Sequence, residues 1–164
     1  MTLAVCVLLF VTVQRLAELI LARRNTARLL ARGGIEVAPS HYPLIVGLHA
    51  SWLGGLWYCA LVPGVPSPEP VLLAMFFALQ ALRIWVLTTL GRRWTTRIIA
   101  VPGEKLIAHG PYHYLAHPNY WVVVGEILVL PLALGLMWYA LVFSVLNLAV
   151  LRLRVRAENK ALGR

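Results

Sequence analysis

A long polar stretch, residues 91–120, holds the side chains of this sequence that are best suited to chemistry. It contains three histidines and a Pro-Gly turn, and it ends in the motif HPNY at residues 117–120, directly before an apolar run. Farther along the chain, Arg154 and Glu158 are four residues apart, so they share one face of a helix. If these groups converge, they form a pocket that is polar toward water and apolar toward lipid. Such a pocket suits a polar, nucleotide-like cofactor and a lipophilic acceptor.

The polar stretch also predicts the backbone that would carry these groups. Proline is tolerated in the first turn of a helix, so His117 and Pro118 indicate a helix start, whose free N–H groups could hold a carboxylate or a phosphate. Residues 95–101 are rich in β-forming side chains, residues 102–104 are turn-forming, and residues 105–108 could return antiparallel. We therefore predict a short β-hairpin that lies as a lid on the membrane face.

The composition indicates a membrane protein. Of 164 residues, 60% are apolar and 13% are charged, whereas soluble domains are about 45–50% apolar and about 25% charged. The net charge is +9, but the basic residues flank apolar segments, where they would face anionic lipid headgroups. We therefore predict membrane lipid, and no nucleic acid, as a partner. Cys6 and Cys59 lie in apolar runs without the spacing of metal ligands, so we predict no metal site.

Five apolar runs predict an all-α integral membrane protein with about five transmembrane helices. A spanning helix needs about 20 apolar residues, and the last two runs are shorter, so we expect them to form a helical hairpin that leans on its neighbours. The tail from residue 152 should continue the last helix and cap a cofactor pocket. The runs are residues 1–22, 44–62, 71–90, 119–130 and 137–151.

The loops predict the organisation and the orientation of the chain. We expect residues 23–40 to form a short interfacial helix and a loop. Together with the polar stretch and the tail, this segment is rich in arginine, which places all three on the cytoplasmic side and the N-terminus outside. We predict one domain, residues 1–164, in which residues 1–90 supply three spans and residues 91–164 form the cofactor-binding half.

Several polar residues interrupt the apolar runs. Arg15 and Glu18 are three residues apart and can pair. We favour a structural clamp to another helix over a role in the site for this pair. Gln80 and Arg83 could reach a polar interior. His49 could be a base or a substrate contact, although a hydrogen-bonded packing histidine is the better default.

Two distant motifs resemble a known family: GPYHYLAHPNYWVVVGE at residues 110–126 and RVRAENKAL at residues 154–162. Together they resemble the C-terminal signature of the isoprenylcysteine carboxyl methyltransferase family, which consists of integral membrane enzymes that use S-adenosylmethionine. The segments QRLAEL, ARRN and HYPLIVGLH of the N-terminal half resemble a bacterial branch associated with type III polyketide synthases. Members of that branch O-methylate alkylpyrones or alkylresorcinols.

The resemblance implies S-adenosylmethionine as the cofactor, S-adenosylhomocysteine as the product, and roles for individual residues. Arg154 falls on the substrate side, and Arg154 and Glu158 are the predicted catalytic residues. His49 and Trp121 are further candidates for contact with the substrate. The implied cofactor-binding residues are Arg97, Glu104, Lys105, Leu106, Ile107, Tyr112, His117, Pro118, Asn119, Tyr120 and Glu158.

The expected function is therefore O-methylation of a lipophilic small molecule or a prenylated substrate at the membrane. The acceptor would be the carboxyl group of a prenylcysteine-like compound or the hydroxyl group of an alkylpyrone-like or alkylresorcinol-like compound. One alternative is an NADPH-dependent membrane reductase of the sterol-reductase type, although this chain has half the usual number of spans. The other alternative is a non-catalytic membrane scaffold. The sequence leaves the oligomeric state open.

Overall fold

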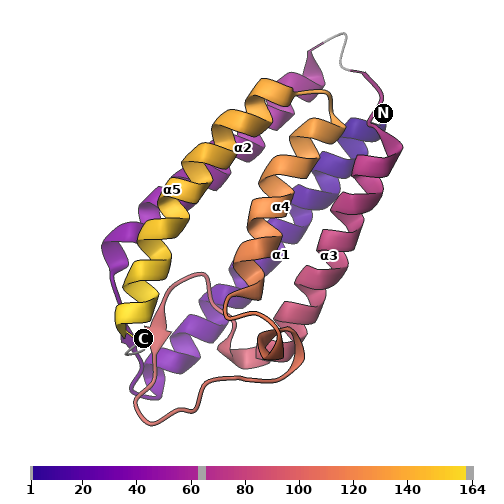
Figure 1. Ribbon diagram of the computed structural model, residues 1–164. Coiled ribbons are helices and arrows are strands. Elements are labelled where there is room, and N and C mark those ends of the chain that lie inside the picture. The colour runs from indigo at the N-terminus through magenta and orange to yellow at the C-terminus, as the bar shows by residue number, and fades with distance from the viewer. Residues whose placement is uncertain (1, 63–65, 162–164) are drawn as a thin grey trace.

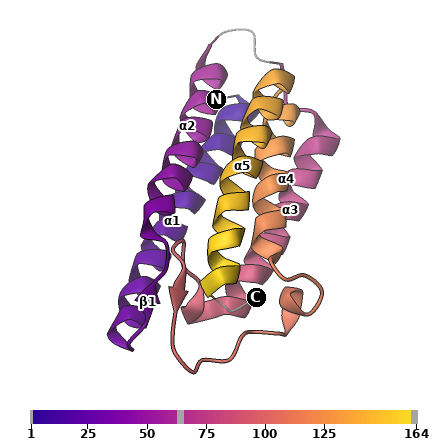
Figure 2. The ribbon, with the colours of Figure 1, turned by 60° about the vertical axis from the view of Figure 1, so that its left-hand side comes forward.

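The described part of the chain, residues 2–62 and 66–161 of a computed structural model, folds into a bundle of five α-helices (Figure 1). Helix α4 packs between α3 and α5, while α2 packs against α1 and α5. The polar loops, the C-terminal end of α1 and the start of α4 gather at one end of the bundle (Figure 2). The helices are α1 (Leu3–Ala31), α2 (Tyr42–Leu61), α3 (Pro70–Leu90), α4 (Pro118–Ala133) and α5 (Met137–Ala161).

Four of these helices, α1, α2, α3 and α5, are long and apolar enough to cross a membrane. Helix α4 is apolar but has 16 residues, which corresponds to about 24 Å at 1.5 Å per residue. The hydrocarbon core of a bilayer is about 30 Å thick. The chain is thus a mostly helical integral membrane protein with four candidate spans, and α4 is a fifth, shorter helix within the same bundle.

The separate interfacial helix predicted at the start of residues 23–40 is wrong, because α1 continues without a break through residue 31, whereas the loop predicted after it follows from residue 32. The sequence has no helix breaker before Gly33, which has a φ of +82°, and α1 ends at Ala31. The basic composition of this segment had indicated a separate element. Residues 23–31 are instead the last part of a 29-residue helix, which carries its arginines to the end of the bundle where the polar loops lie.

The predicted β-hairpin is also wrong. The turn at residues 102–103 is present, but residues 105–108 form no strand. Strand β2 (Ile99–Ala100) pairs antiparallel with β1 (Ile35–Glu36), in the register Ile35 to Ala100 and Glu36 to Ile99. An added hydrogen bond joins the N–H of Val37 to the carbonyl of Ile98 at 2.8 Å. The polar stretch is therefore attached to the N-terminal half of the chain rather than folded on itself.

The predicted helical hairpin of α4 and α5 is confirmed. Pro131 lies in the last turn of α4, Gly135 has a φ of +75°, and the N–H of Leu136 bonds to the carbonyl of Pro131 at 2.9 Å. Helix α5 then runs without a break to Ala161. This return places the end of α5, with its arginines and Glu158, beside the start of α4.

Candidate active site

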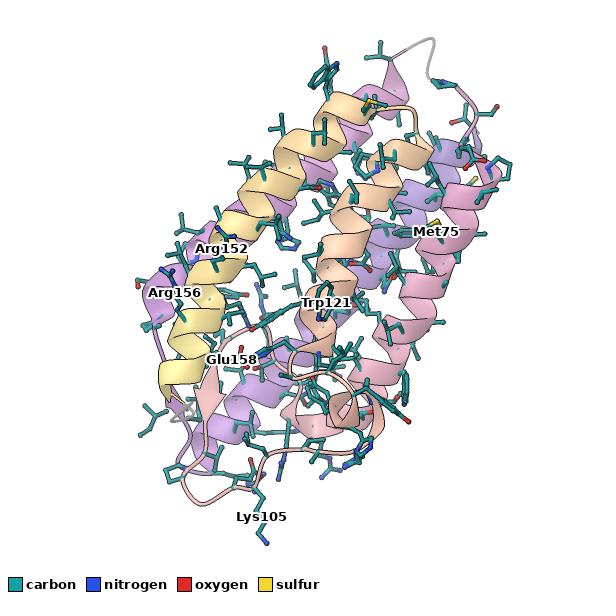
Figure 3. All side chains as sticks on the ribbon, in the orientation of Figure 1. Met75, Lys105, Trp121, Arg152, Arg156 and Glu158 are labelled. Carbon is teal, nitrogen blue, oxygen red and sulfur yellow. The ribbon has the colours of Figure 1, made fainter. Side chains whose placement is uncertain are left out.

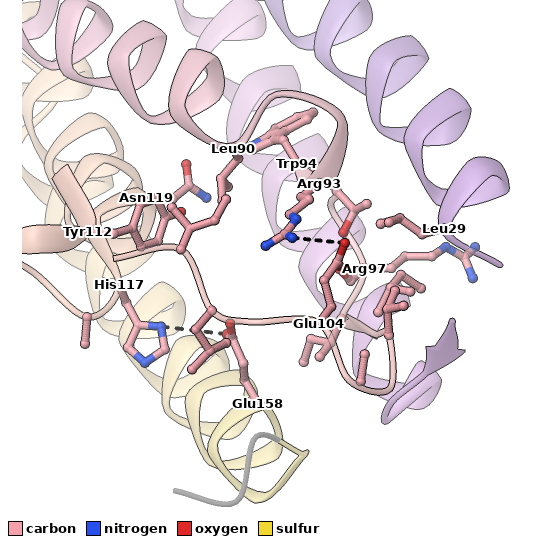
Figure 4. Close-up of a pocket in the computed structure, with 18 of the residues that line it drawn as sticks. Leu29, Leu90, Arg93, Trp94, Arg97, Glu104, Tyr112, His117, Asn119 and Glu158 are labelled. Atoms are coloured by element: carbon pink, nitrogen blue, oxygen red, sulfur yellow. Dashed lines mark hydrogen bonds and ion pairs between the residues drawn. The ribbon is translucent and has the colours of Figure 1, made fainter. Parts of the chain in front are cut away.

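A cavity of about 880 Å³ lies at the polar end of the bundle (Figure 4). Its walls come from the segment between α3 and α4, the first turn of α4, the end of α5, and the N-terminal residues Leu29 and Ile35. Pockets that hold small ligands and cofactors are about 300–1,000 Å³ in volume. The cavity is therefore large enough for a nucleotide-like cofactor.

Most of the predicted cofactor-binding residues line this cavity, and so does Arg154. The cavity thus joins residues of the polar stretch with residues of the C-terminal helix. The predicted residues that line it are Arg97, Glu104, Lys105, Leu106, Ile107, Tyr112, His117, Asn119, Tyr120, Arg154 and Glu158.

Tyr120 joins the two sequence-distant motifs. Its hydroxyl donates a hydrogen bond to the Glu158 carboxylate and accepts one from Nε of Arg154 at 2.9 Å. The His117 ring stacks on the Tyr120 ring, with centroids 5.1 Å apart and planes at 19°. Nδ1 of His117 lies 3.9 Å from Glu158 Oε2, as Figure 4 shows. Imidazole, phenol, guanidinium and carboxylate thus form one connected cluster on a cavity wall.

Arg154 and Arg97 are both held in place, but by different groups. Nη1 of Arg154 donates to the carbonyl of Thr96 at 2.9 Å, so its guanidinium is fixed between α4 and the polar stretch. Nη1 of Arg97 bonds to both carboxylate oxygens of Glu36, at 2.9 and 2.8 Å. The Arg97 guanidinium also lies over the ring of Tyr42, 4.5 Å from its centroid. These contacts tie Arg97 to the N-terminal half at the edge of the cavity.

Glu104 is paired with two arginines. Nη2 of Arg32 lies 3.2 Å from its Oε1. Nη2 of Arg93 lies 3.0 Å from the same atom, as Figure 4 shows. Nη1 of Arg93 also donates to the carbonyl of Lys105 at 2.7 Å. The side chain of Lys105 points away from the bundle (Figure 3). Lys105 therefore contributes its backbone to this wall, while its ammonium group faces outward.

Two side chains of the cavity are available to a ligand. Asn119 has an acceptor without a partner in the described part of the chain, and Tyr112 has a raised pKa. Oδ1 of Asn119 is buried and has no hydrogen-bond partner among the described residues. Burial, together with the negative charge of Glu158, raises the pKa of Tyr112 to about 12. Its hydroxyl therefore remains protonated at neutral pH and can donate a hydrogen bond. An acceptor without a partner, a carboxylate and a neutral phenol fit a ligand that carries amino, hydroxyl and carboxylate groups.

Three predicted site residues do not line the cavity. Pro118 is buried in the first turn of α4, where it starts the helix. Trp121 lies in the same turn and is 63% exposed (Figure 3). His49 lies in α2, and its Nδ1 is 2.8 Å from the carbonyl of Ile45 in the same helix. This bond fits the packing interpretation of His49.

The sequence interpretation missed residues that come from outside the two motifs. Arg93 lies within the polar stretch at residues 91–120, but the sequence interpretation assigned it no role of its own. Arg32 and Glu36 lie more than 60 residues from their partners, so no local pattern could have paired them with the cavity. Leu29 of α1 and Ile35 of β1 also line the cavity, and the pairing of β1 with β2 holds Ile35 there.

The expected clamp by the Arg15–Glu18 pair is confirmed in the interior of the bundle. Nη1 of Arg15 bonds to Glu18 at 2.9 Å, and its Nη2 bonds to Glu126 of α4 at 2.6 Å. Arg83 bonds to both carboxylates, and Gln80 donates to Glu126 at 2.7 Å. As predicted, Gln80 and Arg83 reach a polar interior. These residues do not line the cavity.

Comparison with known proteins identifies the family. The model of the isoprenylcysteine carboxyl methyltransferase (ICMT) family matches residues 72–164, which include the cavity segments of α4 and α5. The chain is 38% identical to the uncharacterized protein YpbQ of Bacillus subtilis (strain 168), over 92% of this chain and 90% of that protein. It is 23% identical to an uncharacterized protein of Haemophilus influenzae, over 91% and 88% of the two chains. No solved structure matches the chain. The chain belongs to the isoprenylcysteine carboxyl methyltransferase family, a family of membrane methyltransferases.

Proposed function

We propose that this protein is an S-adenosylmethionine-dependent O-methyltransferase that acts on a lipophilic acceptor at the membrane. The observation that carries the proposal is the cluster of His117, Tyr120, Arg154 and Glu158 on one wall of the cavity. Family membership supports the same reaction. The position of the cavity, at the end of an apolar bundle, supports an acceptor that stays in the bilayer.

The residues of the cavity fit the polar groups of the cofactor. The Glu158 carboxylate and the unpartnered Oδ1 of Asn119 accept hydrogen bonds from amino and hydroxyl groups. The neutral Tyr112 hydroxyl donates to a carboxylate or a ring nitrogen. Leu106 and Ile107 provide an apolar wall for a purine ring. When bound, the cofactor supplies an electrophilic methyl group to the acceptor oxygen.

The main task of the protein in this reaction is to hold the acceptor oxygen in line with the methyl group, away from water. Arg154 is held by Tyr120 and by the carbonyl of Thr96, so its guanidinium is oriented before the acceptor arrives. It binds the acceptor oxygen and stabilises negative charge on it. A carboxylate acceptor is already a nucleophile and needs no base.

A phenol or enol acceptor differs, because its proton must leave. Arg154 lowers the pKa of such a hydroxyl by stabilising its anion. His117 takes the proton, and the Glu158 carboxylate, 3.9 Å from Nδ1, stabilises the resulting imidazolium. The same cluster thus serves the carboxyl group of a prenylcysteine-like acceptor and the hydroxyl group of an alkylpyrone-like or alkylresorcinol-like acceptor.

We also propose that the cavity faces the cytoplasm from a bacterial inner membrane. Arg23, Arg24 and Arg28 lie in the last part of α1 and Arg32 directly follows it, at the same end of the bundle as the cavity. Basic residues at one end of a helical bundle favour the cytoplasmic side. The N-terminus would then lie outside.

The test uses the full chain purified in detergent. S-adenosylhomocysteine and NADPH are each titrated while the thermal unfolding temperature is measured. Labelled S-adenosylmethionine is then supplied with a panel of lipophilic phenols, pyrones, fatty acids and prenylcysteine analogues. We expect stabilisation by S-adenosylhomocysteine and labelled ester or ether products. Stabilisation by NADPH alone would favour the reductase, and a response to neither ligand would favour a scaffold.

A further inference from the structure

Four charged side chains interrupt the apolar parts of three helices, and the structure connects all four. Arg15 and Glu18 belong to α1, Arg83 to α3 and Glu126 to α4. Residues 3–22, 70–90 and 118–133 of the sequence contain no other Asp, Glu, Lys or Arg. These four side chains come from segments up to 111 residues apart, and we call them the charge ring.

Positive and negative groups alternate around the ring. Arg15 bonds to Glu18 at 2.9 Å and to Glu126 at 2.6 Å. Arg83 bonds to Glu18 through Nε at 2.6 Å and Nη2 at 2.7 Å, and to Glu126 through Nη1 at 3.0 Å. Gln14 donates to Glu18, and Gln80 donates to Glu126. Two positive and two negative charges close the ring, and all four carboxylate oxygens have donors.

The ring is buried inside the helix bundle, where charge is costly. The residues Arg83 and Glu126 are 5% and 2% exposed. Charged groups inside a membrane are rare and mark function or a specific pairing. A buried ion pair adds little net stability compared with apolar packing, and its best-attested use is to fix the register of helices. The ring therefore specifies how α1, α3 and α4 lie relative to one another.

The register of α4 matters because α4 begins at the cavity. Glu126 is its single charged residue, and it lies six residues beyond Tyr120, which is about 9 Å along the helix axis. Next to Glu126, Gly125 is so close to α3 that an added Cβ would lie 2.8 Å from Leu79. Rotation or sliding of α4 would move His117 and Tyr120 relative to Glu158 on α5. Catalytic groups are sensitive to shifts of about 1 Å, which can cost about 100-fold in rate.

We propose that the charge ring is a positioning device for the methyl transfer. Arg15, Glu18, Arg83 and Glu126 hold α4 at one depth and one rotation, and so keep its first turn against Arg154 and Glu158. None of the four touches the cofactor or the acceptor; each acts through α4. This inference rests on the proposed function for its catalytic consequence, although the placement of α4 can be measured without any ligand.

The test compares an unbalanced ring with a rebalanced ring. Glu126→Gln leaves two arginines against one carboxylate, whereas the double variant Arg15→Gln/Glu126→Gln leaves one neutral pair, Arg83 with Glu18. Leu56→Ala is the control, because Leu56 is fully buried in α2 and belongs to neither the ring nor the cavity. If Glu126→Gln fails to fold, Arg83→Lys is used in its place. This variant keeps the positive charge of residue 83 and removes part of its hydrogen bonding.

Two measurements are made on each folded variant. The first is the Kd of S-adenosylhomocysteine, with KM and kcat for S-adenosylmethionine. The second is a distance between spin labels at positions 121 and 156, in a background without Cys6 and Cys59. For Glu126→Gln we expect a Kd raised about tenfold, a higher KM and a broadened label distance. The double variant should return the Kd and the KM to within about threefold of wild type and should narrow the label distance again. Leu56→Ala should lower only the unfolding temperature.

The outcomes separate the two proposals. If the wild type binds no S-adenosylhomocysteine, the proposed function fails, and the label distances still report on the ring. If Glu126→Gln and Leu56→Ala lose similar stability and both keep wild-type Kd and wild-type label distances, the ring is structural only and the inference is overturned. An altered distance with restoration in the double variant supports the positioning role, whatever the ligand.

Discussion

The charge ring and the cavity cluster both bring arginine and glutamate together, but they differ in how their polar atoms are paired. In the ring, every carboxylate oxygen has a donor within the protein, and Glu126 is 2% exposed. In the cavity, the side chains of His117 and Glu158 are 21% and 25% exposed, and Oδ1 of Asn119 has no partner among the described residues. A closed network holds helices together, whereas an open one leaves capacity for a ligand.

This difference predicts the largest effect for a single break in the ring. Arg83→Met leaves Glu18 and Glu126 in the interior of the bundle with one arginine between them. Removing one partner of a buried ion pair costs about 3–5 kcal/mol, so we expect a large fall in the thermal unfolding temperature. Arg24→Met removes the same groups at an exposed position of α1 and should change the unfolding temperature little. Equal effects of the two variants would contradict the burial and mutual pairing of the ring charges.

The cavity cluster should show the opposite pattern, a loss of turnover with little loss of stability. Arg154→Ala and Glu158→Ala should each lower kcat/KM by about 100-fold to 1,000-fold, as removal of an oriented charge-stabilising group does. Labelled methyl transfer and thermal unfolding are measured side by side. Arg152→Ala is the control, because Arg152 is exposed on the outward side of α5 (Figure 3). Near-normal turnover in Arg154→Ala or Glu158→Ala would refute the site assignment.

The buried amides offer a finer comparison. Asn119→Ala removes an unpartnered acceptor from the cavity and should weaken S-adenosylhomocysteine binding about tenfold, which corresponds to about 1.4 kcal/mol for one hydrogen bond to a ligand. Asn147 of α5 is also buried, and its Nδ2 has no partner among the described residues, but it does not line the cavity. Asn147→Ala should leave the Kd unchanged in isothermal titration. A similar loss in both variants would show that the effect is not local to the cavity.

The smallest effect is expected where an ion pair of the cavity wall meets water. Arg32 is paired with Glu104, but its side chain is 61% exposed, and exposed pairs contribute about 0–1 kcal/mol. Arg32→Ala should therefore change the Kd of S-adenosylhomocysteine by less than about threefold. Arg93→Ala should do more, because it also releases the carbonyl of Lys105. Titrations at low and high salt would check the order, and a larger effect of Arg32→Ala would reverse it.

The sequence predicted the elements whose signals are local. Apolar runs gave the five helices, and His117-Pro118 gave the start of α4 at its observed residue. The sequence also predicted that the start of α4 lies near the end of α5, because successive spans run in opposite directions and bring both segments to the same side of the membrane. The family resemblance added the residue roles, which remain predictions until the variants above are measured.

The sequence could not supply contacts between distant segments. Strand β2 pairs with β1 because residues 35–36 are brought to the polar end by α1, and a two-residue strand has no periodicity to detect. The second acidic member of the ring, Glu126, lies 111 residues from Arg15. A lone glutamate in an apolar run indicates some partner but does not say which one. Both the pairing of β1 with β2 and the contact of Arg15 with Glu126 depend on the tertiary fold, which brings distant segments together.

The short length of α4 has a consequence for how substrates would reach the cavity. With 16 residues, α4 covers about 24 Å. If the C-terminal end of α4 is level with the nearby ends of the neighbouring helices, its first turn would lie deeper in the membrane than the lipid phosphates. A lipid-like acceptor could then present its oxygen by lateral diffusion within one leaflet, without being extracted into water. Turnover would follow the mole fraction of acceptor among the lipids rather than its bulk concentration, and dilution with inert detergent would slow the reaction at constant total substrate.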